Sequence, residues 1–314
     1  MSAAGLGLLI VSLAPLRLPA QETSSGLYGQ AASALLNRSF PSPRVEYLLL
    51  DLRSRQTLAV RWAHVEQPIP VGSLLKPFVA LAYGELHADL NSPEPLRQFP
   101  VLRCRGKSDG CWRAGGHGSM ALEQALAQSC NAYFLALARD LSASETDSGF
   151  SDGLAAMGRV SASYGLPAPP AAGSIPGSDE QRIPRMLIGV TPEWRISPVA
   201  LARAYATLAG QPRSELAGRL LSGMRLAAGH QGTVAKIGQH PGGILAKTGT
   251  ASCVEGRDDD RCVANGDGLV VALTPAENPR LLLLVRQRGT TGAQAAEVAG
   301  RMLSRLEESH APAR

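Results

Sequence analysis

Apolar positions along the chain predict strands near both ends and helices between them. Residues 45–50 and 57–62 are short, β-prone apolar runs separated by a polar turn, which is typical of a hairpin. Three further strand-like runs follow late in the chain, at 242–252, 266–275 and 280–288. Segments from both ends of the chain are therefore expected to share one antiparallel sheet.

The intervening residues have helical spacing. From Ser73 to Leu86 apolar side chains recur as in a helix buried on most sides, and Pro77 falls in its first turn, where a missing N–H is tolerated. The other predicted helices are 120–129, 132–141, 151–166, 197–210 and 292–308. Residues 167–184 are rich in Pro, Gly and Ser and should be irregular. This order predicts an α+β fold, an antiparallel sheet flanked by helices, with an all-α insertion at about 91–210.

The N-terminus has the apolar run of an export signal. The run from Leu6 to Leu16 is too short to cross a bilayer, fits the core of a secretory signal and allows cleavage after Ala20. No basic residue precedes it, so a short membrane anchor is the alternative. We expect a signal peptide or anchor at 1–20, a connecting segment at 21–44 and one large domain at 45–314. The protein is then exported, periplasmic or otherwise extracytoplasmic, with membrane association left open.

The composition limits the classes of binding partner that we expect for this chain. The 314 residues are 45% hydrophobic and 18% charged, as in ordinary globular proteins. The net charge of +5 comes from scattered arginines rather than basic runs, which gives no reason to expect a nucleic-acid partner. A mildly positive surface would suit an anionic surface such as a cell wall. No cofactor is expected.

The cysteines favour short disulfide-closed loops. Cys104 and Cys111 bracket one short polar segment, and Cys253 and Cys262 bracket another, which suits local disulfides in an exported protein, with free thiols as the alternative. Cys130 has no partner in this scheme and is expected to be a buried apolar side chain. Both spacings are wider than C-x-x-C, and the six histidines form no ligand pairs, so no metal site is predicted.

Lysine is scarce, which makes each lysine informative. The chain has four Lys against 27 Arg. A desolvated ammonium can lose its proton, whereas a guanidinium cannot. Lys76 follows Ser73 by three residues, so on a helix the two side chains share a face. A neutral amine in that position can take the serine proton and create a nucleophile.

Two more short motifs accompany this pair. Residues 129–131 read Ser-Cys-Asn, the only S-x-N in the chain, and residues 247–249 read Lys-Thr-Gly within a strand-like run. A lone S-x-x-K motif is weak evidence of function, because the pattern arises easily by chance. The ordered trio S-x-x-K, S-x-N and K-T-G is the signature of penicillin-binding proteins and the related β-lactamases.

Longer stretches support the same resemblance. Residues 111–138, from a Gly-His-Gly turn into the second motif, and residues 191–210 resemble the corresponding segments of monofunctional penicillin-binding transpeptidases. The similarity covers about residues 45–305. The chain thus looks like a transpeptidase domain of the serine β-lactamase and D,D-peptidase superfamily, closest to class B-like enzymes but without a pedestal domain. His117 of the Gly-His-Gly turn is expected to be a turn or packing residue.

The resemblance implies a role for each motif residue. Ser73 would be the acylated nucleophile, Lys76 its general base, and Ser129 a proton relay to the leaving amine. Asn131 would hold the substrate's peptide amide, and Lys247 would add the positive potential that keeps the other lysine neutral. The implied substrate-binding residues are Thr248, Gly249 and Thr250. In the family, backbone N–H groups of Ser73 and Thr250 would form the oxyanion hole.

The acyl acceptor decides the reaction. Between 150 and 190 no Glu is followed by Asn at the spacing a class A β-lactamase uses for deacylation, and Asn131 is polar where a class D enzyme has an apolar residue. Both points favour a D,D-transpeptidase acting on D-Ala-D-Ala stem peptides of peptidoglycan. The alternatives are a D,D-carboxypeptidase, a β-lactamase-like hydrolase, or a non-turnover penicillin-binding sensor or scaffold. Expected partners are stem peptides, β-lactams and other cell-wall synthesis proteins.

Overall fold

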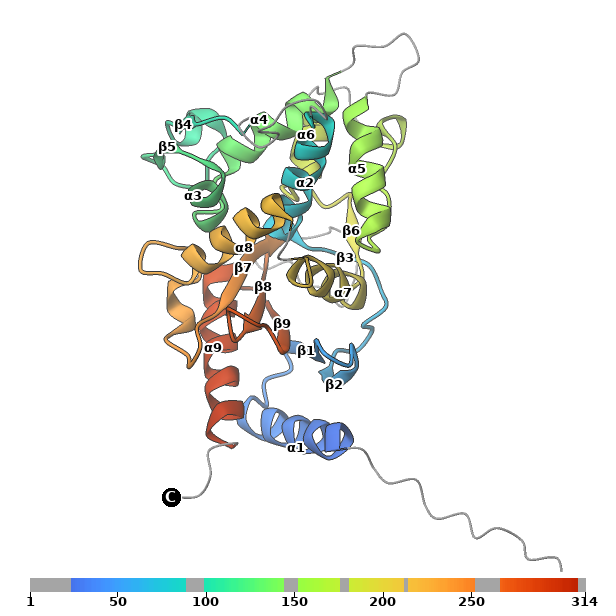
Figure 1. Ribbon diagram of the computed structural model, residues 1–314, viewed down its shortest axis with the longest axis vertical. Coiled ribbons are helices and arrows are strands. Elements are labelled where there is room, and N and C mark those ends of the chain that lie inside the picture. Colours follow the sequence, from blue (N-terminus) through green and yellow to red (C-terminus); the bar gives the residue numbers. More distant parts are fainter. Residues whose placement is uncertain are drawn as a thin grey trace, which may run out of the picture.

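A central five-stranded sheet joins the two ends of the chain in the computed structural model, which describes residues 24–88, 99–143, 152–175, 181–211, 214–251 and 266–309 (Figure 1). The strands lie in the order β2-β1-β9-β8-β7, and each neighbouring pair is antiparallel. They are β1 (Val45–Asp51), β2 (Thr57–Arg61), β7 (Leu245–Ala251), β8 (Asp267–Thr274) and β9 (Leu281–Arg288). The predicted α+β class and the sheet built from both chain ends are confirmed.

Both faces of the sheet are covered, which explains its nearly continuous apolar strands. On β9, Leu282 and Leu284 belong to one core cluster while Leu283 and Val285 belong to another, because successive side chains point to opposite faces. Helices α1 (Ser24–Ser39) and α9 (Gly292–Glu308) cover the second face.

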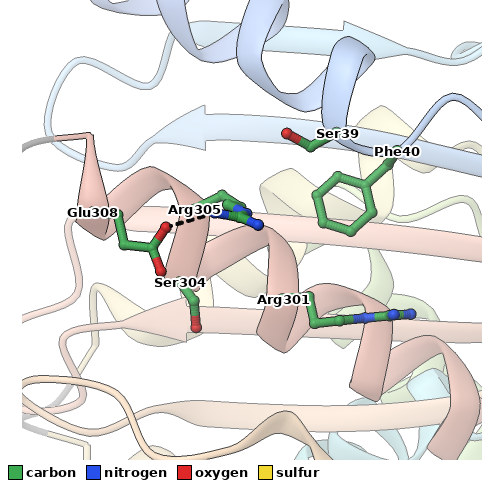
Figure 2. Close-up of a pocket in the computed structure, with 6 residues that line it drawn as sticks. All are labelled: Ser39, Phe40, Arg301, Ser304, Arg305 and Glu308. Carbon is green, nitrogen blue, oxygen red and sulfur yellow. Dashed lines mark hydrogen bonds and ion pairs between the residues drawn. The ribbon is translucent and has the colours of Figure 1, made fainter.

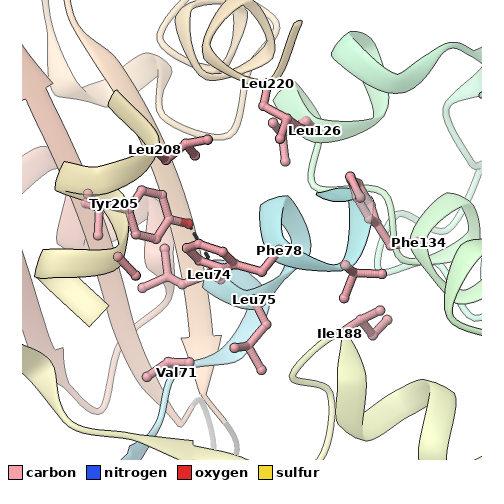
Figure 3. Packing of buried hydrophobic residues seen from close by; sticks show 14 of the residues in the cluster. Val71, Leu74, Leu75, Phe78, Leu126, Phe134, Ile188, Tyr205, Leu208 and Leu220 are labelled. Atoms are coloured by element: carbon pink, nitrogen blue, oxygen red, sulfur yellow. Dashed lines mark hydrogen bonds between the residues drawn. The ribbon is translucent and has the colours of Figure 1, made fainter. Parts of the chain in front are cut away.

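The other face carries the helical part of the chain. These helices are α2 (Lys76–Leu86), α3 (Leu122–Ala127), α4 (Asn131–Ser142), α5 (Asp152–Ser163), α6 (Arg182–Leu187), α7 (Pro198–Ala209) and α8 (Glu215–Ala227). Helix α2 lies at their centre, and Figure 3 shows Phe78 surrounded by side chains from neighbouring elements. The ring of Phe78 makes edge contacts with Tyr164 and Tyr205, each at 5.5 Å between centroids. This packing fixes the start of α2, which carries the first motif.

The insertion differs from the expectation in one respect, because it is not purely helical. Strand β4 (Leu102–Cys104) pairs with β5 (Gly118–Met120), and β6 (Arg195–Ile196) pairs with β3 (Ile69–Pro70). Strands of two or three residues are too short to show an alternating pattern in the sequence.

Three helices were also missed. Helix α1 falls in the predicted connecting segment, α6 begins within the stretch 167–184 that was expected to be irregular, and α8 falls between 210 and 242, where no element was predicted. Helix α8 nevertheless has the expected spacing, because Leu216, Leu220 and Met224 form its buried stripe. A serine at position 214 caps its first turn.

Residues 1–20 and the Cys253–Cys262 pair lie outside the described residues, so the predictions of export and of that disulfide stay predictions. Within the described ranges, no helix combines the length and the hydropathy needed to cross a membrane.

Candidate active site

The turn that carries Ser73 lies against β7, the strand at one end of the sheet order. Ser73 is half-buried in a 3₁₀ turn, Gly72–Leu75, and α2 begins at the next residue. A Cβ on Gly72, whose φ is +59°, would lie 2.5 Å from the carbonyl oxygen of Thr250, and a Cβ on Gly249 would lie 2.4 Å from that of Val71. Two glycines therefore allow the turn and the strand to approach backbone to backbone. This contact is what brings the first and third motifs together.

Tyr205 supports the same turn with a hydrogen bond. Its hydroxyl, on α7, donates a buried hydrogen bond of 2.9 Å to the carbonyl oxygen of Leu74. That carbonyl belongs to the last turn before α2, where it needs a partner in a dry environment. Sequence reasoning did not single out Tyr205, although it falls in the stretch 191–210 that carries the family resemblance.

Replacing Tyr205 by Phe should destabilise the protein more than the same change at Tyr164. Both rings pack on Phe78, but Tyr164 bonds a side-chain amide, at Gln211, instead of the active-site turn. Losing the Tyr205 bond leaves a buried carbonyl unpaired, which costs about 1–3 kcal/mol of unfolding free energy. Urea unfolding of the two variants measures the difference, and a larger loss for Tyr164→Phe would contradict this account.

Lys76 is fully buried and points into the second motif. Its Nζ donates hydrogen bonds to the carbonyl oxygen of Ser129 (2.7 Å), to Ser129 Oγ (3.2 Å) and to Asn131 Oδ1 (2.6 Å). Burial lowers the pKa of the Lys76 ammonium to about 7, against a smaller opposing effect of Cys130 and Cys111. A neutral amine is therefore accessible near neutral pH.

The hydrogen-bond partners of Lys76 suit a neutral amine. A neutral amine has two N–H groups and one lone pair. The Ser129 carbonyl and Asn131 Oδ1 can only accept, so they take the two N–H groups. In the neutral form the lone pair then faces the third partner, Ser129 Oγ, whose O–H can donate to it.

Lys247 reaches the same serine from β7. Its buried Nζ donates to Ser129 Oγ at 2.8 Å and to the carbonyl oxygen of Thr248 at 2.8 Å. Burial, with the nearby Lys76, holds the pKa of Lys247 well below its usual range. Both amines contact one hydroxyl oxygen, so holding a full charge on each at the same time is unfavourable. The expected role of Lys247 in keeping Lys76 neutral stays a prediction.

Ser129 has a strained backbone. Its φ is +49°, which is uncommon for a residue with a side chain. Hydrogen bonds from the N–H of Ser129 to Leu126 (3.1 Å) and from that of Cys130 to Ala125 (2.9 Å) hold this turn between α3 and α4. Backbone strain of this kind persists where the surrounding structure enforces it, as at functional sites. Here it aims the Ser129 hydroxyl at the two lysines.

The structure thus gathers Lys76, Ser129, Asn131 and Lys247 through direct hydrogen bonds. Ser73 lies one helical turn from Lys76, and within the described residues its hydroxyl makes no hydrogen bond to that amine.

The substrate-binding candidates on β7 have different surroundings. Thr248 is nearly buried and its hydroxyl donates to Thr233 at 2.9 Å, whereas Thr250 is exposed and its Oγ1 accepts from the N–H of Gly292 at 3.0 Å. Strand alternation places both hydroxyls on the face of β7 opposite the Lys247 side chain. Gly249, on the Lys247 face, provides the close backbone contact described above.

The predicted disulfide between Cys104 and Cys111 is wrong. Both cysteines are free and buried, as is Cys130. The segment between the first two folds as a tight turn with Gly106 at φ +116°, and both sulfurs lie near His117 Nδ1, at 3.5 and 3.2 Å. The sequence correctly predicted that the two cysteines lie close together, but not that each thiol has the imidazole as a neighbour instead of a disulfide partner. The prediction that His117 is a turn or packing residue stays a prediction, and its Nδ1 contacts both thiols.

A pocket of about 420 Å³ lies elsewhere, between α1 and α9. Figure 2 shows its lining of Ser39, Phe40, Arg301, Ser304, Arg305 and Glu308. Its most prominent polar contact is the ion pair between Arg305 and Glu308, at 3.0 Å. None of the motif residues lines this pocket, so its position gives no support to a role in the chemistry.

Comparisons with solved structures agree with the fold. The chain is similar to the apo transpeptidase domain of Burkholderia pseudomallei penicillin-binding protein 3 (18% identity, TM-score 0.63, 92% of this chain and 95% of that one). It is also similar to Pseudomonas aeruginosa PBP2 in complex with WCK 5153 (18%, 0.64, 92% and 77%). A third similar structure is Helicobacter pylori PBP2 in its complex with MreC (16%, 0.68, 90% and 63%).

A search of curated proteins finds no match. The family profile described as the penicillin binding protein transpeptidase domain matches residues 47–305, which is most of the chain and includes all three motifs. The chain therefore belongs to the penicillin-binding protein transpeptidase domain family.

Proposed function

We propose that this protein is a serine D,D-transpeptidase that cross-links D-Ala-D-Ala stem peptides of peptidoglycan through an acyl-enzyme on Ser73. The observation that carries the proposal is the convergence of two buried amines, Lys76 and Lys247, on one hydroxyl, Ser129 Oγ, next to the turn of Ser73. Such an arrangement can pass a proton through the Ser129 hydroxyl.

The first half-reaction forms the acyl-enzyme. Ser73 Oγ attacks the carbonyl carbon between the two D-Ala residues while its proton passes to the neutral Lys76 amine. As the C–N bond breaks, the proton continues through Ser129 to the leaving D-Ala amine. Backbone N–H groups of Ser73 and Thr250 can hold the oxyanion, because the two segments lie in contact. A peptide amine then attacks the ester, and its proton returns along the same route.

The described surroundings of the site offer no support for deacylation of the class A type. In the described residues, no carboxylate bonds to Lys76, Ser129, Asn131 or Lys247. A hydrolase of the class A type needs such a group to activate water. Transfer to an amine and hydrolysis by a D,D-carboxypeptidase could both use the lysine and serine relay, so the peptide-exchange experiment must distinguish them.

Incubation with a donor stem peptide and a D-amino acid distinguishes the reactions. A transpeptidase should exchange the terminal D-Ala for the added D-amino acid, with a yield that rises with acceptor concentration; mass spectrometry of the peptides measures it. Loss of D-Ala without exchange would show a D,D-carboxypeptidase. A protein that is acylated by penicillin but converts no peptide would be a sensor or scaffold.

Ligands and location follow from the same proposal. The substrate ends in a carboxylate, to which the exposed hydroxyl of Thr250 on β7 can donate, and β-lactams that mimic the peptide would be trapped as esters on Ser73. We expect an extracytoplasmic protein, where stem peptides are cross-linked. The complex of H. pylori PBP2 with MreC makes association with other cell-wall synthesis proteins a reasonable expectation.

A further inference from the structure

Three buried cysteines and a histidine form a compact cluster beside the second motif. The members are Cys104 at the end of β4, Cys111 and His117 in the loop to β5, and Cys130 at the start of α4. Their sulfur and imidazole nitrogen atoms all lie within 4.8 Å of one another. The cysteine spacing predicted no metal, because the cluster forms only when the fold brings Cys130 to the loop.

The distances match a tetrahedral site with an ion at its centre. His117 Nδ1 lies 3.2 Å from Cys111 Sγ and 3.5 Å from Cys104 Sγ, and Cys111 Sγ lies 4.0 Å from Cys130 Sγ. Ligands around Zn²⁺, at about 2.3 Å for sulfur and about 2.1 Å for nitrogen, stand about 3.8 Å (S to S) and about 3.6 Å (S to N) apart. A disulfide would instead need sulfurs about 2.05 Å apart.

The loop is built to hold this geometry. The N–H of His117 donates to the carbonyl of Cys104 at 3.2 Å, and the N–H of Cys111 donates to that of Gly106 at 3.0 Å. A Cβ on Gly106 would lie 2.0 Å from the carbonyl oxygen of Ala114, and one on Gly116 would lie 2.2 Å from that of Cys104. The backbone thus folds tightly around the cluster and fixes three of its four members.

The orientation of the imidazole indicates which nitrogen would bind. His117 Nε2 is buried and has no hydrogen-bond partner among the described residues, so no bond to that atom sets the ring. Nδ1 nevertheless faces the two sulfurs. The two thiols and an edge contact from Trp112, at 5.3 Å between ring centroids, are thus the contacts that orient the ring.

We propose that Cys104, Cys111, Cys130 and His117 Nδ1 bind one Zn²⁺ as a structural site. Soft thiolates with one imidazole in a closed tetrahedral arrangement favour zinc over harder divalent ions. Binding releases the three thiol protons to solvent and leaves a complex of net charge −1. No oxidant or other reactant is needed.

The site would position the second motif. Cys130 stands between Ser129 and Asn131, so an ion bound to its sulfur ties both motif residues to the rigid loop. This consequence rests on the proposed function, whereas the binding of zinc does not. We therefore expect zinc removal to slow acylation and zinc addition to restore it.

Metal analysis of the full chain tests the site directly. Protein purified without chelator should contain one zinc per chain, and Cys111→Ser or His117→Ala should reduce that content at least about tenfold. The double variant Cys253→Ser, Cys262→Ser is the matched control and should keep the zinc. Absence of zinc in the wild type after incubation with Zn²⁺, or full zinc content in Cys111→Ser, would refute the proposal.

Cobalt substitution tests the site in the wild-type protein, so that a misfolded variant cannot account for the result. Wild-type protein stripped by a chelator and loaded with Co²⁺ should show thiolate-to-metal charge transfer and the strong visible bands of a tetrahedral ion. Octahedral spectra would overturn the proposal, and so would a disulfide among the three cysteines in freshly isolated protein. The rate of penicillin acylation, measured on stripped and on zinc-restored protein, tests whether the ion positions the second motif. Equal rates in the two states would reject the positioning role alone. No acylation in either state would reject the proposed function but not the zinc site.

Discussion

The variant Ser73→Ala is expected to lose covalent labelling by a fluorescent penicillin completely. The acyl-enzyme is an ester of the Ser73 hydroxyl, and alanine has no atom that can form it. Removing a nucleophile from a serine acyl-transfer site costs about 10³-fold or more in rate. Gel fluorescence and intact mass measure the result, with one added penicilloyl group per wild-type chain and none on the variant.

Ser197→Ala provides the matched control. Ser197 caps α7 by accepting a hydrogen bond from the N–H of Ala200, so its loss should reduce stability by about 1 kcal/mol and leave labelling intact. Ser73→Ala should unfold at nearly the wild-type urea concentration. Equal labelling of Ser73→Ala would place the nucleophile elsewhere. An unlabelled wild type would remove both the transpeptidase and the sensor interpretations.

The sheet and the motif residues could be predicted because each carries a local signal. Strands buried on both faces, such as residues 281–288, give apolar runs too strong to miss, and the lysine of each flanking motif stands out in a chain with 27 arginines. The bonds of both lysines to Ser129 Oγ were not predicted, because the sequence analysis expected Lys76 to contact the hydroxyl of Ser73.

What the sequence did not reveal depends on contacts between distant segments. The bond from Tyr205 to Leu74 spans 131 residues, and nothing in either local pattern indicates it. The cysteine cluster needs Cys130 from one segment and a loop from another, so a rule based on spacing chose a disulfide instead. Helix α8 was missed for a different reason, since its glycines and polar residues obscured a regular apolar stripe.

Lys76→Arg should be nearly as inactive in acylation as Lys76→Ala, although it keeps the positive charge. The proposed base must be neutral to accept the Ser73 proton, and burial brings the lysine pKa to about 7. A guanidinium stays protonated in the same place and has no lone pair to offer. General-base catalysis contributes about 10²–10⁴-fold, so the second-order rate of penicillin acylation should fall by that range in both variants.

Lys236→Arg makes the same chemical change at an exposed position, where the amine lies 3.9 Å from Glu297, and it should acylate at the wild-type rate. Since arginine is also larger, the inactive variant must be shown to be folded by its urea midpoint. Lys76→Ala is the second control for size, because it removes the amine without adding atoms to the buried site. If Lys76→Arg acylates within about threefold of the wild type, a general-base contribution of at least about 10²-fold is ruled out. The lysine would then act only through its charge and its hydrogen bonds to Ser129 and Asn131.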